Sequence, residues 1–162
     1  MSKRVLFLFA LLGWLLTPAG SGRSPLAAQQ AGTTGGAAGA ISGAYTFLRE
    51  GEVVQLTVED GKLSGYISRF GESDSDKGQF IDQFFDKTSL KGSRLSFNTK
   101  TVHGVWYDFT GVVATAPDKK PGEEGYHIVR GTLVEHTTDA NGAEKAMQRQ
   151  VEFKSFPAEV NR

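Results

Sequence analysis

The sequence contains no cysteine and no excess of either charge, and both absences narrow the range of functions. Without cysteine the chain cannot form a disulfide scaffold, a thiolate zinc site or an iron–sulfur cluster, and it has no cysteine nucleophile. With 18 Lys and Arg against 18 Asp and Glu, it also lacks the basic field of a nucleic-acid-binding protein. We therefore expect no nucleic-acid partner. The length of 162 residues suits one ordinary domain.

Long hydrophobic runs are missing too, and the one substantial run is short. Residues 5–16 are apolar apart from Gly13, and they follow Lys3 and Arg4. Such a run is too short to cross a bilayer, which needs about 20 apolar residues. A basic start, a short apolar stretch and then small residues are typical of a secretory signal peptide. The sequence therefore predicts a signal peptide over residues 1–28, a secreted or periplasmic protein, and no membrane span after cleavage.

The remainder of the chain divides into a leader, a domain and a tail. Cleavage is expected after Ala28, with Ser21 as the alternative site. Residues 29–42 are rich in Gly and Ala and cannot bury enough surface to offset the entropy lost on ordering, so they predict a flexible leader. A single folded domain is predicted over 43–157, followed by a C-terminal tail over 158–162.

Short segments of alternating apolar and polar residues, separated by turn residues, predict an antiparallel β domain. The clearest alternation places Val54, Leu56 and Val58 on one side of a strand and polar residues on the other. Asp60 and Gly61 follow it and form a strong signal for a two-residue hairpin, because both positions must tolerate a positive φ.

Residues 79–90 allow two interpretations. Their large apolar residues are Phe80, Ile81, Phe84 and Phe85. That spacing suits one face of a helix, whereas a strand would carry large apolar side chains on both faces. We favour the strand because residues 88–90 continue it and the Lys91-Gly92 pair suits a hairpin turn.

The next hairpin is constrained by its pattern, because a slip of one residue would move every side chain to the other face. Keeping the large apolar residues on one face pairs Phe97 with Phe109. A two-residue loop at 103–104 would instead place Phe97 beside Thr110. We therefore predict a three-residue loop over 102–104.

Eight strands joined in sequence by short turns favour a closed, antiparallel up-and-down β-barrel, because closure removes the edge strands. A two-sheet β-sandwich is the alternative. The first strand begins with Gly43-Ala44-Tyr45, where calycin barrels often have Gly-x-Trp. With its strand count, the chain resembles the calycin group, the lipocalin- and avidin-like barrels. This resemblance implies a fold and carries no activity.

Signals of catalysis or metal binding are weak. The sequence has no Gly-x-Ser-x-Gly turn, and the acidic segment 71–78 lacks the spacing of an EF-hand loop. His127 and His136 are separated by an odd number of residues on one predicted strand, so they face opposite sides. His103 suits a turn. We assign no catalytic residue, metal ligand or cofactor, and we favour a role other than that of an enzyme.

Aromatic residues are the remaining functional signal. Five of them would converge inside the barrel: Tyr45, Phe47, Phe97, Tyr107 and Phe109. They form either a plain core or the wall of a pocket for a small, largely apolar ligand. Our leading hypothesis is ligand binding inside the barrel by these five residues. The alternative is a non-catalytic structural or protein-interaction module of the cell envelope, with the outward-facing Trp106 in its contact face; its protein partner is unknown.

Overall fold

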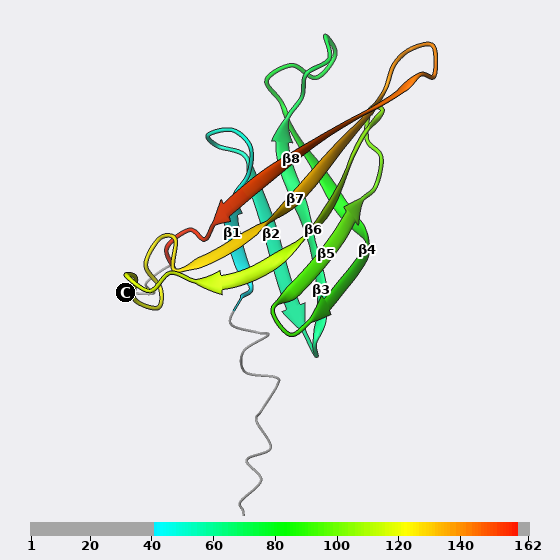
Figure 1. Ribbon diagram of the computed structural model, residues 1–162. Helices are drawn as coiled ribbons and strands as arrows, with labels where there is room; N and C mark the ends of the chain where they lie inside the picture. The colour runs from blue at the N-terminus through cyan, green and yellow to red at the C-terminus, as the bar shows by residue number, and fades with distance from the viewer. Residues whose placement is uncertain (1–40, 159–162) are drawn as a thin grey trace, which may run out of the picture. The chain divides into compact units, whose positions relative to one another are not determined.

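The computed structural model describes residues 41–158, which form strands and turns and include no helix. The eight strands are β1 (Gly43–Thr46), β2 (Val53–Glu59), β3 (Lys62–Phe70), β4 (Phe80–Lys91), β5 (Arg94–Thr99), β6 (Val105–Thr115), β7 (His127–Thr138) and β8 (Glu144–Lys154). They form one antiparallel sheet in sequence order (Figure 1). The predicted signal peptide and most of the predicted leader lie outside the described residues. Within 41–158 we find no helix able to cross a membrane.

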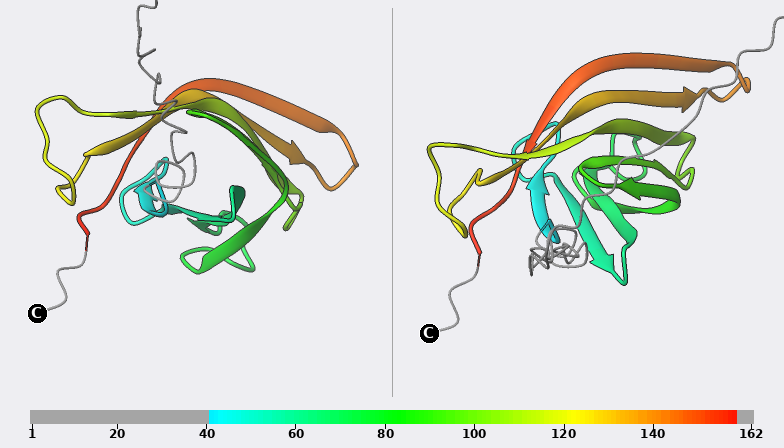
Figure 2. Two further views of the ribbon diagram at one scale, coloured as in Figure 1. Left: turned by 90° about the horizontal axis from the view of Figure 1, so that it is seen from below. Right: turned by 60° about the horizontal axis from the view of Figure 1, so that its bottom comes forward.

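The sheet curls until its last strand reaches its first, as Figure 2 shows. Tyr45 and Ser155 form a bridge between these strands, and the Phe156 N–H donates to the Ala44 carbonyl at 2.9 Å. This contact uses the residues that directly follow β8, while the hairpin of β7 and β8 extends away from β1 (Figure 1). The result is a half-barrel. The predicted all-β up-and-down fold is confirmed, and the strands form one sheet where a sandwich would have two.

Alternate residues of the strands face the concave side of the sheet and form its apolar core. The largest of its fully buried apolar side chains are Tyr45, Phe109, Phe153, Leu56, Ile67, Leu95 and Leu133. The ring of Phe109 lies over two paired glycines, Gly111 and Gly131. A Cβ at either glycine would come within 2.5 or 2.8 Å of the ring's terminal carbon. These two positions therefore lack side chains so that the ring can lie close to the backbone.

The turn at Asp60 and Gly61 is the predicted two-residue hairpin, with φ of 50° and 74°. The ambiguous segment forms β4, so the strand interpretation is confirmed. As expected of a strand, β4 has large side chains on both faces. Phe80 and Phe84 point outward and are 58% and 57% exposed, while Gln83 points inward and is fully buried.

The predicted three-residue loop between β5 and β6 is wrong. His103 and Gly104 form a two-residue turn with φ of 50° and 75°. Val102 and Val105 flank it and exchange both of their backbone hydrogen bonds at 3.0 Å. Positive φ at both central residues gives the turn a twist that matches the twist of the flanking strands. Two residues are therefore enough to connect β5 and β6.

The predicted pairing of Phe97 with Phe109 is nevertheless confirmed. The two strands keep this register up to Asn98, and the mismatch with the turn is absorbed beyond it. There the Lys100 N–H donates to the carbonyl of Phe84 on β4 at 2.9 Å instead of to β6. An irregularity of this kind takes up one residue without moving the apolar side chains to the other face.

Candidate functional site

A recess of about 250 Å³ lies at one end of the concave face, between the turn that joins β1 to β2 and strands β6 to β8. We call it the charged recess. It is lined by Leu48, Arg49, Glu52, Arg69, Phe70, Glu72, Tyr107, Glu135 and Arg149. Some of these residues lie on strands and point to the concave side, in line with the buried apolar side chains of the same strands. The charged recess therefore adjoins the apolar core.

Arg69 is held rigidly at the base of this site, with only 4% of its surface exposed. Its Nε donates to Gln83 Oε1 at 2.5 Å, and its Nη1 donates to the Phe70 carbonyl at 3.2 Å. The Gln83 amide nitrogen donates to the carbonyls of Lys100 and Val105, at 3.2 and 2.8 Å. Because both amide hydrogens are used in this way, the amide oxygen faces the guanidinium. Gln83 therefore fixes the position of Arg69.

Glu52 is also buried, and its carboxylate serves the backbone. It accepts from the N–H groups of Arg49 and Phe70, each at 3.1 Å. These two bonds tie the turn between β1 and β2 to the end of β3. Both oxygens of Glu52 are thus occupied by neutral donors, and its main role is to shape the rim of the charged recess.

Two ion pairs complete the wall. Arg149 Nη2 donates to Glu135 Oε2 at 2.5 Å, and these side chains come from β8 and β7. The Arg149 Nε is buried and has no hydrogen-bond partner among residues 41–158. At the outer edge, Arg49 pairs with Glu72, and both side chains are more than half exposed. Exposed pairs of this kind contribute little stability, so the outer pair can open at small cost.

Tyr107 brings a hydroxyl group into the charged recess. Its ring packs edge-on against Phe47, with ring centroids 5.4 Å apart. Burial raises the pKa of the Tyr107 phenol, and the carboxylate of Glu135 raises it further. The phenol therefore stays protonated at neutral pH and keeps its capacity to donate a hydrogen bond.

The five aromatic residues singled out from the sequence are all buried on the concave side. Phe97 stacks on Phe109 at 5.2 Å, and Phe47 contacts Tyr107. Phe153 contacts both pairs, so four of the five rings belong to one packed cluster. Of the five, only Tyr107 lines the charged recess. Tyr45 lies in the bridge between β1 and β8.

The sequence patterns did not indicate that Arg69, Glu135 and Arg149 belong to a candidate site. Each stands two positions from an inward apolar residue on its strand, where alternation predicts another apolar side chain. A charged residue at an inward position was the signal that could have found them, since buried charges require partners.

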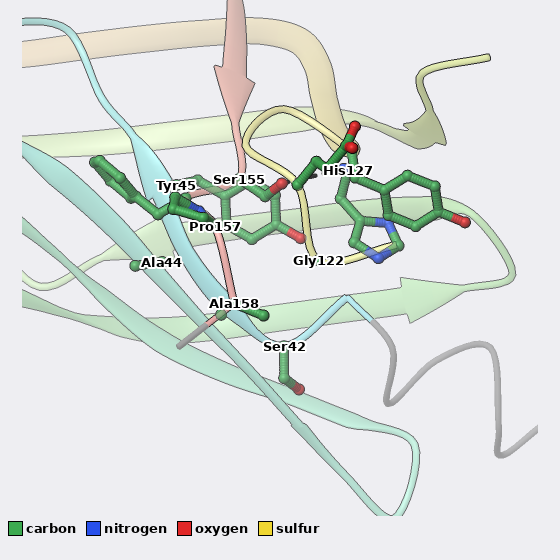
Figure 3. Close-up of a pocket in the computed structure, with 12 residues that line it drawn as sticks. Ser42, Ala44, Tyr45, Gly122, His127, Ser155, Pro157 and Ala158 are labelled. Carbon is green, nitrogen blue, oxygen red and sulfur yellow. Dashed lines mark hydrogen bonds between the residues drawn. The ribbon is translucent and has the colours of Figure 1, made fainter. Parts of the chain in front are cut away.

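A second pocket, of about 400 Å³, lies where the start of β1 meets the loop between β6 and β7 and the segment after β8 (Figure 3). Its polar lining includes Tyr45, Tyr126, His127 and Ser155. The Tyr45 hydroxyl donates to the Ile41 carbonyl at 2.7 Å, and burial raises its pKa to about 12. Burial lowers the pKa of His127, which is therefore neutral at pH 7. The pocket therefore combines neutral polar groups with one acidic lining residue, Glu123, and among residues 41–158 no lysine or arginine lines it, in contrast to the charged recess.

The remaining histidines have structural partners. His103 Nδ1 lies 2.5 Å from Asp76 Oδ2 and joins the β5–β6 turn to the segment between β3 and β4. His136 lies on the outer face, opposite to His127 as predicted, and its Nε2 is 2.9 Å from Asp108 Oδ2. Trp106 also lies on the outer face and stacks on the His136 ring at 4.8 Å. Within 41–158, no three acidic or histidine side chains gather as a metal site would require.

Comparisons with known proteins do not assign the chain to a family. No model of a known protein family matches it. A search of curated proteins also found no similar sequence. The functional argument therefore rests on the geometry of the charged recess.

Proposed function

We propose that this protein is an exported, non-catalytic binding protein that holds a small ligand in the charged recess. The observation that carries the proposal is the buried Nε of Arg149, which has no partner among the described residues. A buried N–H group without an acceptor costs about 1–3 kcal/mol. The Arg149 side chain as a whole is 36% exposed, so a small shift of its guanidinium would bring this N–H group to a ligand acceptor and recover that free energy.

The charged recess also offers apolar contacts. Leu48 and Phe70 form part of its wall. Met147 lies beside this wall, where its Sδ accepts from Arg149 Nη2 at 3.3 Å, and it is 59% exposed. A ligand with an apolar body and a polar end would match this combination. Because Phe47 packs on Tyr107 and Phe97 on Phe109, the proposal places the ligand beside Tyr107 rather than among all five rings.

The proposal also includes export of the protein and an architectural relationship to calycin barrels. The signal-peptide pattern in residues 1–28 supports export to the periplasm or the medium. The up-and-down order of the strands supports a relationship in architecture to the calycin barrels.

Native mass spectrometry of the protein purified from the cells that make it tests this function. We expect an additional mass that disappears when the protein is denatured, and the identity of that mass would name the ligand. A bare native mass that stays bare after incubation with a library of small amphipathic compounds would refute the proposal.

A second candidate function is protein interaction through the outer face. The half-buried Trp106, stacked on His136, favours it, because aromatic residues are enriched where proteins meet. Trp106→Ala should then abolish capture of a partner while leaving any ligand mass unchanged. Equal capture by the variant would count against this function.

A further inference from the structure

We infer that the charged recess binds a singly charged carboxylate, held by Arg69, Arg149 and the Tyr107 hydroxyl. This inference rests on the proposed function and specifies the chemical class of the ligand. The ligand would be a small monocarboxylic acid with an apolar tail.

The first argument is the state of Arg69. Its guanidinium is buried, yet no carboxylate lies within 4.0 Å of it among residues 41–158. Its acceptors, the Gln83 amide oxygen and the Phe70 carbonyl, are both neutral. Buried charges in proteins are normally paired, because an isolated charge loses much of its solvation. A ligand carboxylate would supply the missing counter-charge.

The second argument is that nearby carboxylates already have partners. Glu52 accepts from two backbone N–H groups, and Glu135 accepts from Arg149. The partly exposed Arg149 guanidinium, whose Nε has no acceptor among residues 41–158, and the Tyr107 side chain remain as donors in the same wall. Two guanidinium groups and a phenol form a set of donors suited to a planar oxyanion.

The third argument selects the charge and size of the anion. Three arginines and three glutamates line the charged recess, so it has no excess positive charge for a doubly charged phosphate. The one lining guanidinium without a carboxylate partner in the described part of the chain, that of Arg69, matches a single negative charge. The volume of about 250 Å³ accommodates a short acid and no bulky headgroup. Leu48 and Phe70 would contact its hydrocarbon tail.

The test compares two probes with the same tail, octanoate and 1-octanol, by isothermal titration calorimetry of the purified protein. We expect octanoate to bind at least tenfold more tightly than 1-octanol. Arg149→Gln and Tyr107→Phe should each weaken octanoate binding, by about tenfold and several-fold, and leave the affinity for 1-octanol unchanged. The matched control is Arg130→Gln, on the outer face and paired with Glu152, which should leave both affinities unchanged.

Arg69→Gln is the most direct variant, but it removes a buried side chain and can impair folding. Octanoate binding by this variant is therefore interpreted only if its circular dichroism spectrum matches that of the wild type. If the spectrum differs, the test depends on Arg149→Gln and Tyr107→Phe. Equal affinities for the two probes, unaffected by the variants, would overturn the carboxylate class and leave the proposed function intact. Binding of neither probe would overturn the carboxylate class and also count against the proposed function. Competition by inorganic phosphate as strong as that by acetate would overturn the preference for a single charge.

Discussion

Replacing Gln83 by leucine should destabilise the fold more than any surface change of the same type. Gln83 is fully buried, and its amide joins β3, β4 and the hairpin of β5 and β6. Leucine has a similar volume but no polar atoms. The substitution would leave the Arg69 Nε without a partner. The Val105 carbonyl would lose one bond but keep the one from the Val102 N–H, and the more exposed Lys100 carbonyl would lose its bond from the amide.

The expected magnitude follows from these lost hydrogen bonds. Each buried group left unpaired costs about 1–3 kcal/mol, and water can reach the Lys100 carbonyl more easily. One unpaired N–H group and the bond lost at the Val105 carbonyl should therefore lower the free energy of unfolding by about 2–4 kcal/mol. This is a large fraction of the roughly 5–15 kcal/mol that is typical for a domain.

Urea denaturation followed by circular dichroism measures this loss. The control is Gln148→Leu, the same substitution at an exposed position of β8, which should change the free energy of unfolding by no more than about 0.5 kcal/mol. An unchanged slope of free energy against urea would show that both variants unfold like the wild type. A Gln83→Leu protein as stable as the control would refute the role assigned to the Gln83 amide.

Two further predictions concern stability. Gly131→Ala should lower the free energy of unfolding by about 2–4 kcal/mol, because the new Cβ would lie 2.3 Å from the Thr110 carbonyl oxygen and 2.8 Å from the Phe109 ring. Thermal melting measures this loss, and an unchanged melting temperature would contradict the prediction. Hydrogen bonds from Ser73 and His103 lower the pKa of Asp76 in the folded protein, so its stabilising contribution is present above the unfolded pKa and is lost as pH falls through the folded pKa. Carboxyl groups titrate between roughly pH 5 and pH 2. Over this range the melting temperature of the wild type should therefore fall further than that of Asp76→Asn, and equal falls in the two proteins would contradict this.

Much of the fold could be predicted from local pattern. The alternation of Val54, Leu56 and Val58 determines which side of β2 is buried, because side chains of a strand alternate between faces. Asp60 and Gly61 determine a tight turn by their tolerance of positive φ. The loop at His103 was predicted one residue too long, because the sequence carries no sign that an irregularity beyond Asn98 corrects the register.

The candidate site required the tertiary structure. Arg69 and Arg149 stand on β3 and β8, and nothing local indicates that they share one recess with Tyr107 of β6. The curl of the sheet brings them together, and it depends on the summed twist of all the strands and on the bridge between Tyr45 and Ser155.

By itself, then, the sequence determined an all-β chain with eight strands in up-and-down order and the assignment of most side chains to a face, because these depend on neighbouring residues. Only the tertiary structure decided that the sheet curls into a half-barrel, bridged between β1 and the end of β8, and that charged side chains gather in one recess on its concave face. These features depend on contacts between strands far apart in the chain, such as β1 with β8. A buried charged side chain is stable only where residues from other strands pair with it or bind it by hydrogen bonds. Its environment therefore cannot be predicted from the sequence of its own strand.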